Sequence, residues 1–188
     1  MSLVELVARA DARGLAAGGL ACTDRCLPLL GGDDELLRPL WANLADDSDW
    51  AGNLKKARAA LGPVEAAGVT GSVADDAARL VRRMLETAPA ERTAEALRPW
   101  ADACSAASLR VHRLLDPAAD PDADGAGDTG GPSPLVAAEL RRQTAVLELV
   151  AGHGAHGLRA ALEVSVEGRR VLRAVVSRRA RGAAGPGA

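Results

Sequence analysis

Apolar residues recur every three or four positions over most of this chain, the spacing that places them on one face of an α-helix. The clearest stripe lies within residues 73–85. Another runs from Leu97 to Leu114 in steps of three and four residues, which is typical of a helix packed against other helices. The pattern therefore predicts a chain built of amphipathic helices.

Capping residues support several of these helices. Ser72 stands three residues before an acid, as in a capping box, and Ser48 or Asp49 can cap a helix that continues to Leu61. Ser133-Pro134 is an N-cap followed by proline in the first helical position. We expect helices to begin at each of these points.

Glycine and proline predict interruptions elsewhere. A first helix over 2–13 is expected to end where Gly14, Gly18 and Gly19 cluster, followed by a loose or short helical stretch. Pro99 falls inside an apolar stripe, so we expect a kink or a break there.

The last apolar stripe, over 158–181, allows two interpretations. On a helical wheel most of its Leu, Val and Ala residues fall on one side, and Arg169 falls with most of the charged residues on the other. A hairpin turning at Glu167-Gly168 is the competing interpretation, since residues 162–166 alternate in polarity. The wheel accounts for more residues and favours a helix.

Composition strengthens the helical prediction. The 188 residues include 41 Ala, 26 Leu and 15 Val but no Ile, Phe or Tyr. Strong helix formers dominate, while the β-branched and aromatic residues that cover sheets are scarce. The scarcity of residues with AT-rich codons also fits a high-GC bacterial genome. With so few bulky side chains, Trp41, Trp50 and Trp100 are expected to anchor the core.

An Asp-, Gly- and Pro-rich segment divides the chain. Residues 116–133 contain five Asp and no large apolar residue, which is typical of a flexible linker. We therefore expect an all-α bundle of five to seven helices in one domain: a bundle over 1–116, a flexible acidic linker over 117–132 and a C-terminal helical hairpin over 133–182 that packs back on the bundle. A disordered tail over 183–188 follows.

Charge and cysteine content limit the class of protein. The longest uncharged stretches are ten residues, far short of the roughly 20 that a membrane-spanning helix needs, so no membrane contact is expected. Three Cys and no basic, apolar leader favour reduced thiols in a cytoplasmic protein. The net charge of −2 divides into +6 over residues 168–188, which hold six Arg and no acid, and −8 over the rest.

Gly152-His153-Gly154-Ala155-His156-Gly157, preceded by Val146-Leu147-Glu148-Leu149, resembles the first motif of Rossmann-type methyltransferases. That resemblance implies a nucleotide-like cofactor held at a strand-to-helix turn. However, Val150 occupies the position of the motif's first glycine, and only 31 residues follow Gly157. A glycine-rich turn between helices is therefore favoured, and no cofactor is predicted.

Three histidines are the minimum set for a catalytic zinc site with an open position. His112, His153 and His156 provide that number, and such a site would be similar to those of helical-bundle metalloenzymes of the DinB/YfiT group. The alternative is that His153 and His156 are solvent-exposed residues of a turn. No Glu-x-x-His or His-Glu-x-x-His occurs, which disfavours di-iron carboxylate bundles.

The three cysteines allow a weaker metal hypothesis. Cys22 and Cys26 are spaced i, i+4, close enough on a helix to share a metal ion, whereas Cys104 falls on an apolar stripe. Buried, unreactive thiols are the simpler interpretation.

The basic helix at the C-terminal end is the remaining candidate. Arg169, Arg170, Arg173 and Arg178 form a face that can bind an acidic protein surface or phosphates, or simply be solvated. The sequence favours a non-catalytic protein that acts through protein contacts, as a scaffold or regulator, and self-association as a homodimer through 134–176. The alternatives are a metal-dependent bundle enzyme using the three histidines and a regulator that contacts nucleic acid through these arginines.

Overall fold

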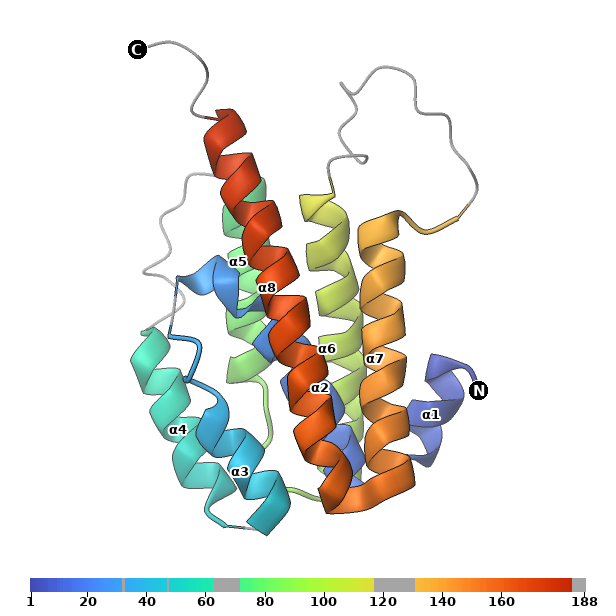
Figure 1. Ribbon diagram of the computed structural model, residues 1–188. Coiled ribbons are helices and arrows are strands. Elements are labelled where there is room, and N and C mark those ends of the chain that lie inside the picture. Colours follow the sequence, from blue (N-terminus) through green and yellow to red (C-terminus); the bar gives the residue numbers. More distant parts are fainter. Residues whose placement is uncertain (32, 47, 63–71, 117–130, 184–188) are drawn as a thin grey trace.

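The computed structural model describes residues 1–31, 33–46, 48–62, 72–116 and 131–183, and these residues fold as an all-α bundle (Figure 1). They contain no strand, as the sequence predicts. Most of the expected linker and of the expected tail, residues 117–130 and 184–188, lies outside the described residues. The elements are α1 (Leu3–Arg9), α2 (Ala12–Cys26), the 3-10 helix η1 (Leu27–Leu30), α3 (Arg38–Asp46), α4 (Trp50–Leu61), α5 (Val73–Glu86), α6 (Ala94–Leu115), α7 (Pro134–His153), the 3-10 helix η4 (Gly154–His156) and α8 (Gly157–Ala183).

Helix α2 lies at the centre of the bundle and packs against α6, α7 and α8 (Figure 1). The glycines expected to end the first helix are instead inside α2. Gly19 faces the indole of Trp100, where an added Cβ would lie 2.5 Å from a ring carbon. The prediction failed because small residues here permit close helix packing, a property that local turn propensity does not reveal.

Helices begin at the three predicted points, and side-chain caps are present at Asp49 and Ser72 but not at Ser133. Asp49 accepts a hydrogen bond from the Gly52 amide at 2.8 Å, and Ser72 and Asp75 form a reciprocal capping box. Helix α6 runs through Pro99 without a break, so a break at this proline was the wrong expectation. The proline lies in the second turn of α6, where the cost is one missing backbone hydrogen bond.

Arginine side chains satisfy the carbonyl groups at the ends of neighbouring helices. Arg58 of α4 donates to the carbonyl oxygens of Leu85 and Glu86 at the end of α5, at 3.1 and 2.8 Å. Because the last carbonyls of a helix have no partner within it, these bonds join pairs of helices. The same arrangement is made by Arg13 and Arg92 at the end of α3, Arg82 at the end of α4 and Arg98 at the end of α1.

The three tryptophans are core residues, as expected. Trp41, Trp50 and Trp100 are each only 4% exposed, and the rings of Trp50 and Trp100 meet edge to face with centroids 6.4 Å apart. Their indole N–H groups donate to a carboxylate or a carbonyl oxygen, so none is buried without a partner.

Residues 157–183 form one continuous helix, which confirms the helix rather than the hairpin at Glu167-Gly168. Helices α7 and α8 lie side by side, and both pack on α2 (Figure 1). Helix α7 ends at His153 and is followed by Gly154, whose φ of +55° lies in the region that favours glycine. No helix within the described residues has the length and apolar character needed to cross a membrane.

Candidate functional site

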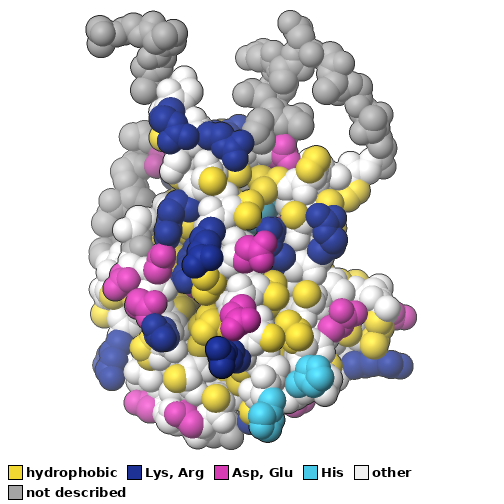
Figure 2. All heavy atoms as spheres, in the orientation of Figure 1, with side chains coloured by type: hydrophobic (Ala, Val, Ile, Leu, Met, Phe, Trp, Pro, Cys, Tyr) yellow, Lys and Arg dark blue, Asp and Glu magenta, His cyan; other side chains and the backbone are white. Residues whose placement is uncertain are grey.

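The structure does not bring the three candidate histidines together. His112 is 1% exposed in α6, and its imidazole Nε2 lies 3.6 Å from a carboxylate oxygen of Glu139 in α7. His153 is fourteen residues further along α7, about 20 Å at the rise of an α-helix. His153 and His156 are exposed (Figure 2). The three-histidine hypothesis fails because the ligands sit at different heights of the bundle, and no group of three metal-binding side chains occurs among the described residues.

The glycine-rich segment around these histidines joins two helices. Residues 154–156 form η4, between α7 and α8. The described chain has no strand before this turn, so the geometry of the methyltransferase motif is absent. The interhelical turn favoured by the sequence is confirmed.

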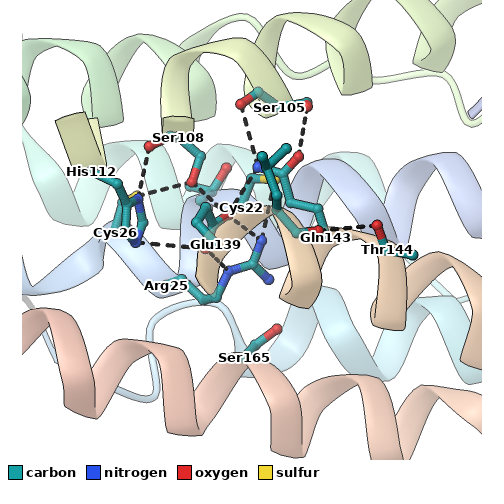
Figure 3. A network of polar contacts seen from close by, with 12 residues as sticks. Cys22, Arg25, Cys26, Ser105, Ser108, His112, Glu139, Gln143, Thr144 and Ser165 are labelled. Atoms are coloured by element: carbon teal, nitrogen blue, oxygen red, sulfur yellow. Dashed lines mark hydrogen bonds and ion pairs between the residues drawn. The ribbon is translucent and has the colours of Figure 1, made fainter. Parts of the chain in front are cut away.

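The structure instead shows a fully buried ion pair between α2 and α7. The Arg25 guanidinium donates to both carboxylate oxygens of Glu139, at 2.8 and 2.6 Å, and both side chains are 0% exposed (Figure 3). Gly168 of α8 lies directly against the Arg25 side chain, where a Cβ would overlap Cδ. Nη1 of Arg25 has no hydrogen-bond partner. The Arg25 charge therefore depends on Glu139.

Further side chains of α6 and α7 complete a polar cluster around Glu139. Ser108 and Gln143 donate to the carboxylate at 2.8 and 3.0 Å, and Ser105 donates to the Gln143 side-chain oxygen at 2.7 Å (Figure 3). Burial raises the pKa of Glu139, but the charge and hydrogen bonds of Arg25, together with His112 and Gln143, outweigh burial and lower this pKa to about 2. Glu139 is thus a carboxylate at neutral pH.

His112 is the titratable group nearest to this cluster. Its Nδ1 lies 2.8 Å from the Ser108 carbonyl oxygen, one turn earlier in α6. Burial lowers the pKa of His112, although Glu139 opposes this shift. A neutral imidazole with Nδ1–H donated to the carbonyl satisfies both observations.

A second buried ion pair joins α2 to α8. Arg169 donates to Asp24 at 2.8 Å and to the Asp34 carbonyl oxygen at 2.6 Å, while Arg173 pairs with the Asp34 carboxylate. Burial raises the pKa of Asp24 to about 6, and Arg169 and the indole N–H of Trp41 partly oppose this effect. Arg169 is only 6% exposed, so its placement on the solvent face was wrong: α8 turns this residue towards the carboxylate of Asp24.

The cysteines are separate from any reactive site. Cys22, Cys26 and Cys104 are all free and buried. Burial raises the pKa of Cys22 to about 12 and shifts Cys26 and Cys104 in the same direction. Since the thiolate is the nucleophile and the metal ligand, these thiols are inert in the folded chain, as the simpler interpretation expects.

Arg25 and Glu139 were missed by the sequence interpretation, although a signal was present. Glu139 and Gln143 lie three and seven residues after Val136, on the buried side of α7. Polar residues i, i+4 within an apolar stripe indicate a buried polar pair. Their partner on α2 had no such signal, because it is 114 positions away.

Comparison with known proteins finds no match to a family model, a curated protein or a solved structure. The geometry of this chain's own residues is therefore the basis for assigning a function. The described residues form an all-α bundle with buried ion pairs, Arg25–Glu139 and Arg169–Asp24. The charged groups that a partner could contact are the exposed ones at the surface.

Proposed function

We propose that this protein is a non-catalytic helical protein that acts through protein contacts. The contact is made by the exposed arginines of α8, Arg170, Arg178 and Arg181, with an acidic surface of a partner protein. The observation that carries this proposal is the division of the α8 arginines into two sets, one paired with acids of the same chain and one exposed without such a pair.

Arg169 and Arg173 belong to the first set, because Asp24 and Asp34 neutralise them. Arg170, Arg178 and Arg181 are exposed, and no ion pair is found for them among the described residues. The C-terminal end of α8 projects beyond α6 and α7, and basic side chains gather there (Figures 1 and 2). No acid follows Glu167 in the sequence, so this projecting surface is positively charged.

The small number of exposed arginines on α8 favours an acidic protein over nucleic acid as the binding partner. DNA carries one negative charge per about 1.7 Å, and binding proteins commonly make about 6–10 phosphate contacts. Three exposed arginines beside a body of net charge −8 supply too few contacts and oppose a long polyanion. A compact acidic patch on a protein needs only two or three such pairs, each bidentate.

The apolar faces of α7 and α8 are used inside the chain. Val136, Val146 and Val150 of α7 are each 4% exposed or less, and Leu172 of α8 is fully buried. Among the large apolar side chains of these two helices, only Val171 is clearly exposed, at 36%. The predicted homodimer through 134–176 stays a prediction, and it would require a surface other than these stripes.

The test measures binding of the full chain to fluorescent poly-L-glutamate and to a short DNA duplex by anisotropy, over a range of salt. Replacing Arg170, Arg178 and Arg181 with Gln is expected to weaken polyglutamate binding by about tenfold, because three exposed ion pairs of roughly 0.5 kcal/mol each are lost.

The matched control replaces three other exposed arginines, Arg110, Arg113 and Arg141, and changes the net charge equally. Equal weakening in both triple variants would show a non-specific charge effect and overturn the proposal. Tighter binding to DNA than to polyglutamate would overturn it in favour of the nucleic-acid regulator.

A further inference from the structure

A groove between α5 and α6 has a volume of about 460 Å³. That volume falls within the roughly 300–1,000 Å³ of small-molecule sites. The groove is lined by residues of α5, by Thr87 directly after it and by residues of α6. It shares no residue with the two buried ion pairs or with the arginine surface of α8.

The floor of the groove offers apolar contact and no hydrogen bond. Met84, Trp100 and Cys104 line it and are 4% exposed or less. The Trp100 indole N–H already donates to the Met84 carbonyl oxygen at 2.8 Å. Burial raises the pKa of the Cys104 thiol, so this residue carries no charge. A ligand over this floor must therefore present an apolar surface.

The wall is also apolar where the second half of α5 faces the first half of α6. Leu80 lines the groove from α5, and Ala103 and Ala107 line it from α6. The small alanine side chains leave the space that larger residues would fill. The resulting trough follows the helix axes and suits an extended alkyl chain.

One end of the groove is polar and positively charged. Arg83 and Thr87 line it at the last turn of α5, beside Ala96 in the first turn of α6. Arg83 is exposed, and no ion pair or side-chain hydrogen bond is found for its guanidinium among the described residues. The negative end of the α5 dipole and the positive end of the α6 dipole meet here and offset each other, so Arg83 supplies the net positive charge. An anionic head group is favoured beside Arg83.

We propose that this groove binds a long-chain carboxylate, a fatty acid, with its carboxylate at Arg83 and its alkyl chain along Leu80, Met84 and Trp100. The apolar floor of the groove selects the alkyl chain, and Arg83 independently selects the negative charge. The site is distinct from the proposed protein contact and does not depend on it.

The experiment titrates the full chain with dodecanoate below its critical micelle concentration and measures the heat of binding and the tryptophan fluorescence. Saturable binding at one site is expected, because Trp100 lines the groove. Dodecanol, which keeps the chain and removes the charge, is expected to bind about five- to tenfold more weakly, as is dodecanoate to Arg83→Gln. Arg110→Gln removes an exposed arginine outside the groove and is the matched control, with unchanged affinity.

A second variant separates binding in the groove from binding elsewhere. Ala103 is exposed and lines the groove, so Ala103→Trp fills the trough without disturbing the buried core. Loss of dodecanoate binding with an unchanged helical circular dichroism spectrum would support the site. Non-saturable uptake, unchanged affinity in Ala103→Trp, or equal affinity for dodecanol and dodecanoate would each overturn the proposal.

Discussion

Removing the charge of Glu139 should destabilise the fold strongly, and the structure sets the size of the effect. Glu139→Gln keeps the shape of the side chain but leaves the Arg25 charge 0% exposed without a counter-charge. Breaking one partner of a buried pair costs about 3–5 kcal/mol. In a chain of this size each kcal/mol lowers Tm by roughly 2–4 °C, so we expect a loss of about 10 °C.

Thermal unfolding followed by tryptophan fluorescence measures this loss, because all three indoles are buried. The control is Glu163→Gln, which removes the exposed pair of Arg159 and Glu163 on α8. Its unfolding midpoint is expected to stay within experimental error, since exposed pairs contribute little. The contrast between the two variants isolates burial as the cause.

A double variant tests the physical reason. Arg25→Met with Glu139→Leu removes both charges, and such replacements are often neutral or stabilising. We expect the double variant to be more stable than Glu139→Gln alone, although Ser108 and Gln143 lose an acceptor. The reasoning is refuted if Glu139→Gln unfolds at the wild-type midpoint, or if the double variant is the less stable of the two.

Other predictions concern titration, packing, thiols and helix ends. The pKa of Asp24 is raised to about 6, so the folded chain holds a proton that the unfolded chain has lost. The stability of the wild type relative to Asp24→Asn should therefore fall as pH rises from about 4 to 6 and stay level above that, in urea midpoints measured over a pH series. Gly19→Ala should cost about 1–3 kcal/mol in the same assay because its Cβ meets Trp100, whereas Gly152→Ala, with open space around its Cβ, should gain about 0.5–1 kcal/mol. All three thiols should resist Ellman's reagent in the native chain and react after unfolding; a thiol that reacts in the native state would contradict its burial. Arg58→Gln, which loses bonds to the end of α5, should cost about 1–3 kcal/mol, and hydrogen exchange should rise at residues 85–88.

Local features of the fold could be predicted from the sequence because their causes are local. The box at Ser72 and the proline at the start of α7 lie within one turn of the helices they begin. The apolar periodicity of 158–181 likewise selected one helix over a hairpin. Each of these signals spans a few residues, so neighbouring side chains determine the outcome.

The errors lie where distant segments determine a residue's environment. The local sequence predicts a helix stop at Gly19. In the fold, the Trp100 ring, 81 positions away in the sequence, occupies the space beside this glycine. The local sequence likewise predicts a solvent-facing Arg169. In the fold, this side chain pairs with Asp24, 145 positions away. A helical wheel assigns polarity but not partners, and it therefore placed a buried arginine in solvent.

The prediction of the candidate site was the least accurate, because its residues come from distant segments of the chain. Three histidines met the minimum ligand number, but metal binding requires them at one height of the bundle, and sequence spacing alone does not fix that height. The cluster around Glu139 comes from α2, α6 and α7, and only its i, i+4 pair on α7 left a trace in the sequence.

The central position of α2 has a consequence for how the chain acquires its structure during synthesis. Its main partners, α6, α7 and α8, lie about 70 to 160 residues after the end of α2, so its buried surface is exposed while the ribosome is still making them. At a translation rate of about 5–20 residues per second, α2 remains an exposed apolar segment for several seconds or more. Stable folding therefore begins only after most of α8 has been made, and a nascent chain stopped before α7 should remain sensitive to protease.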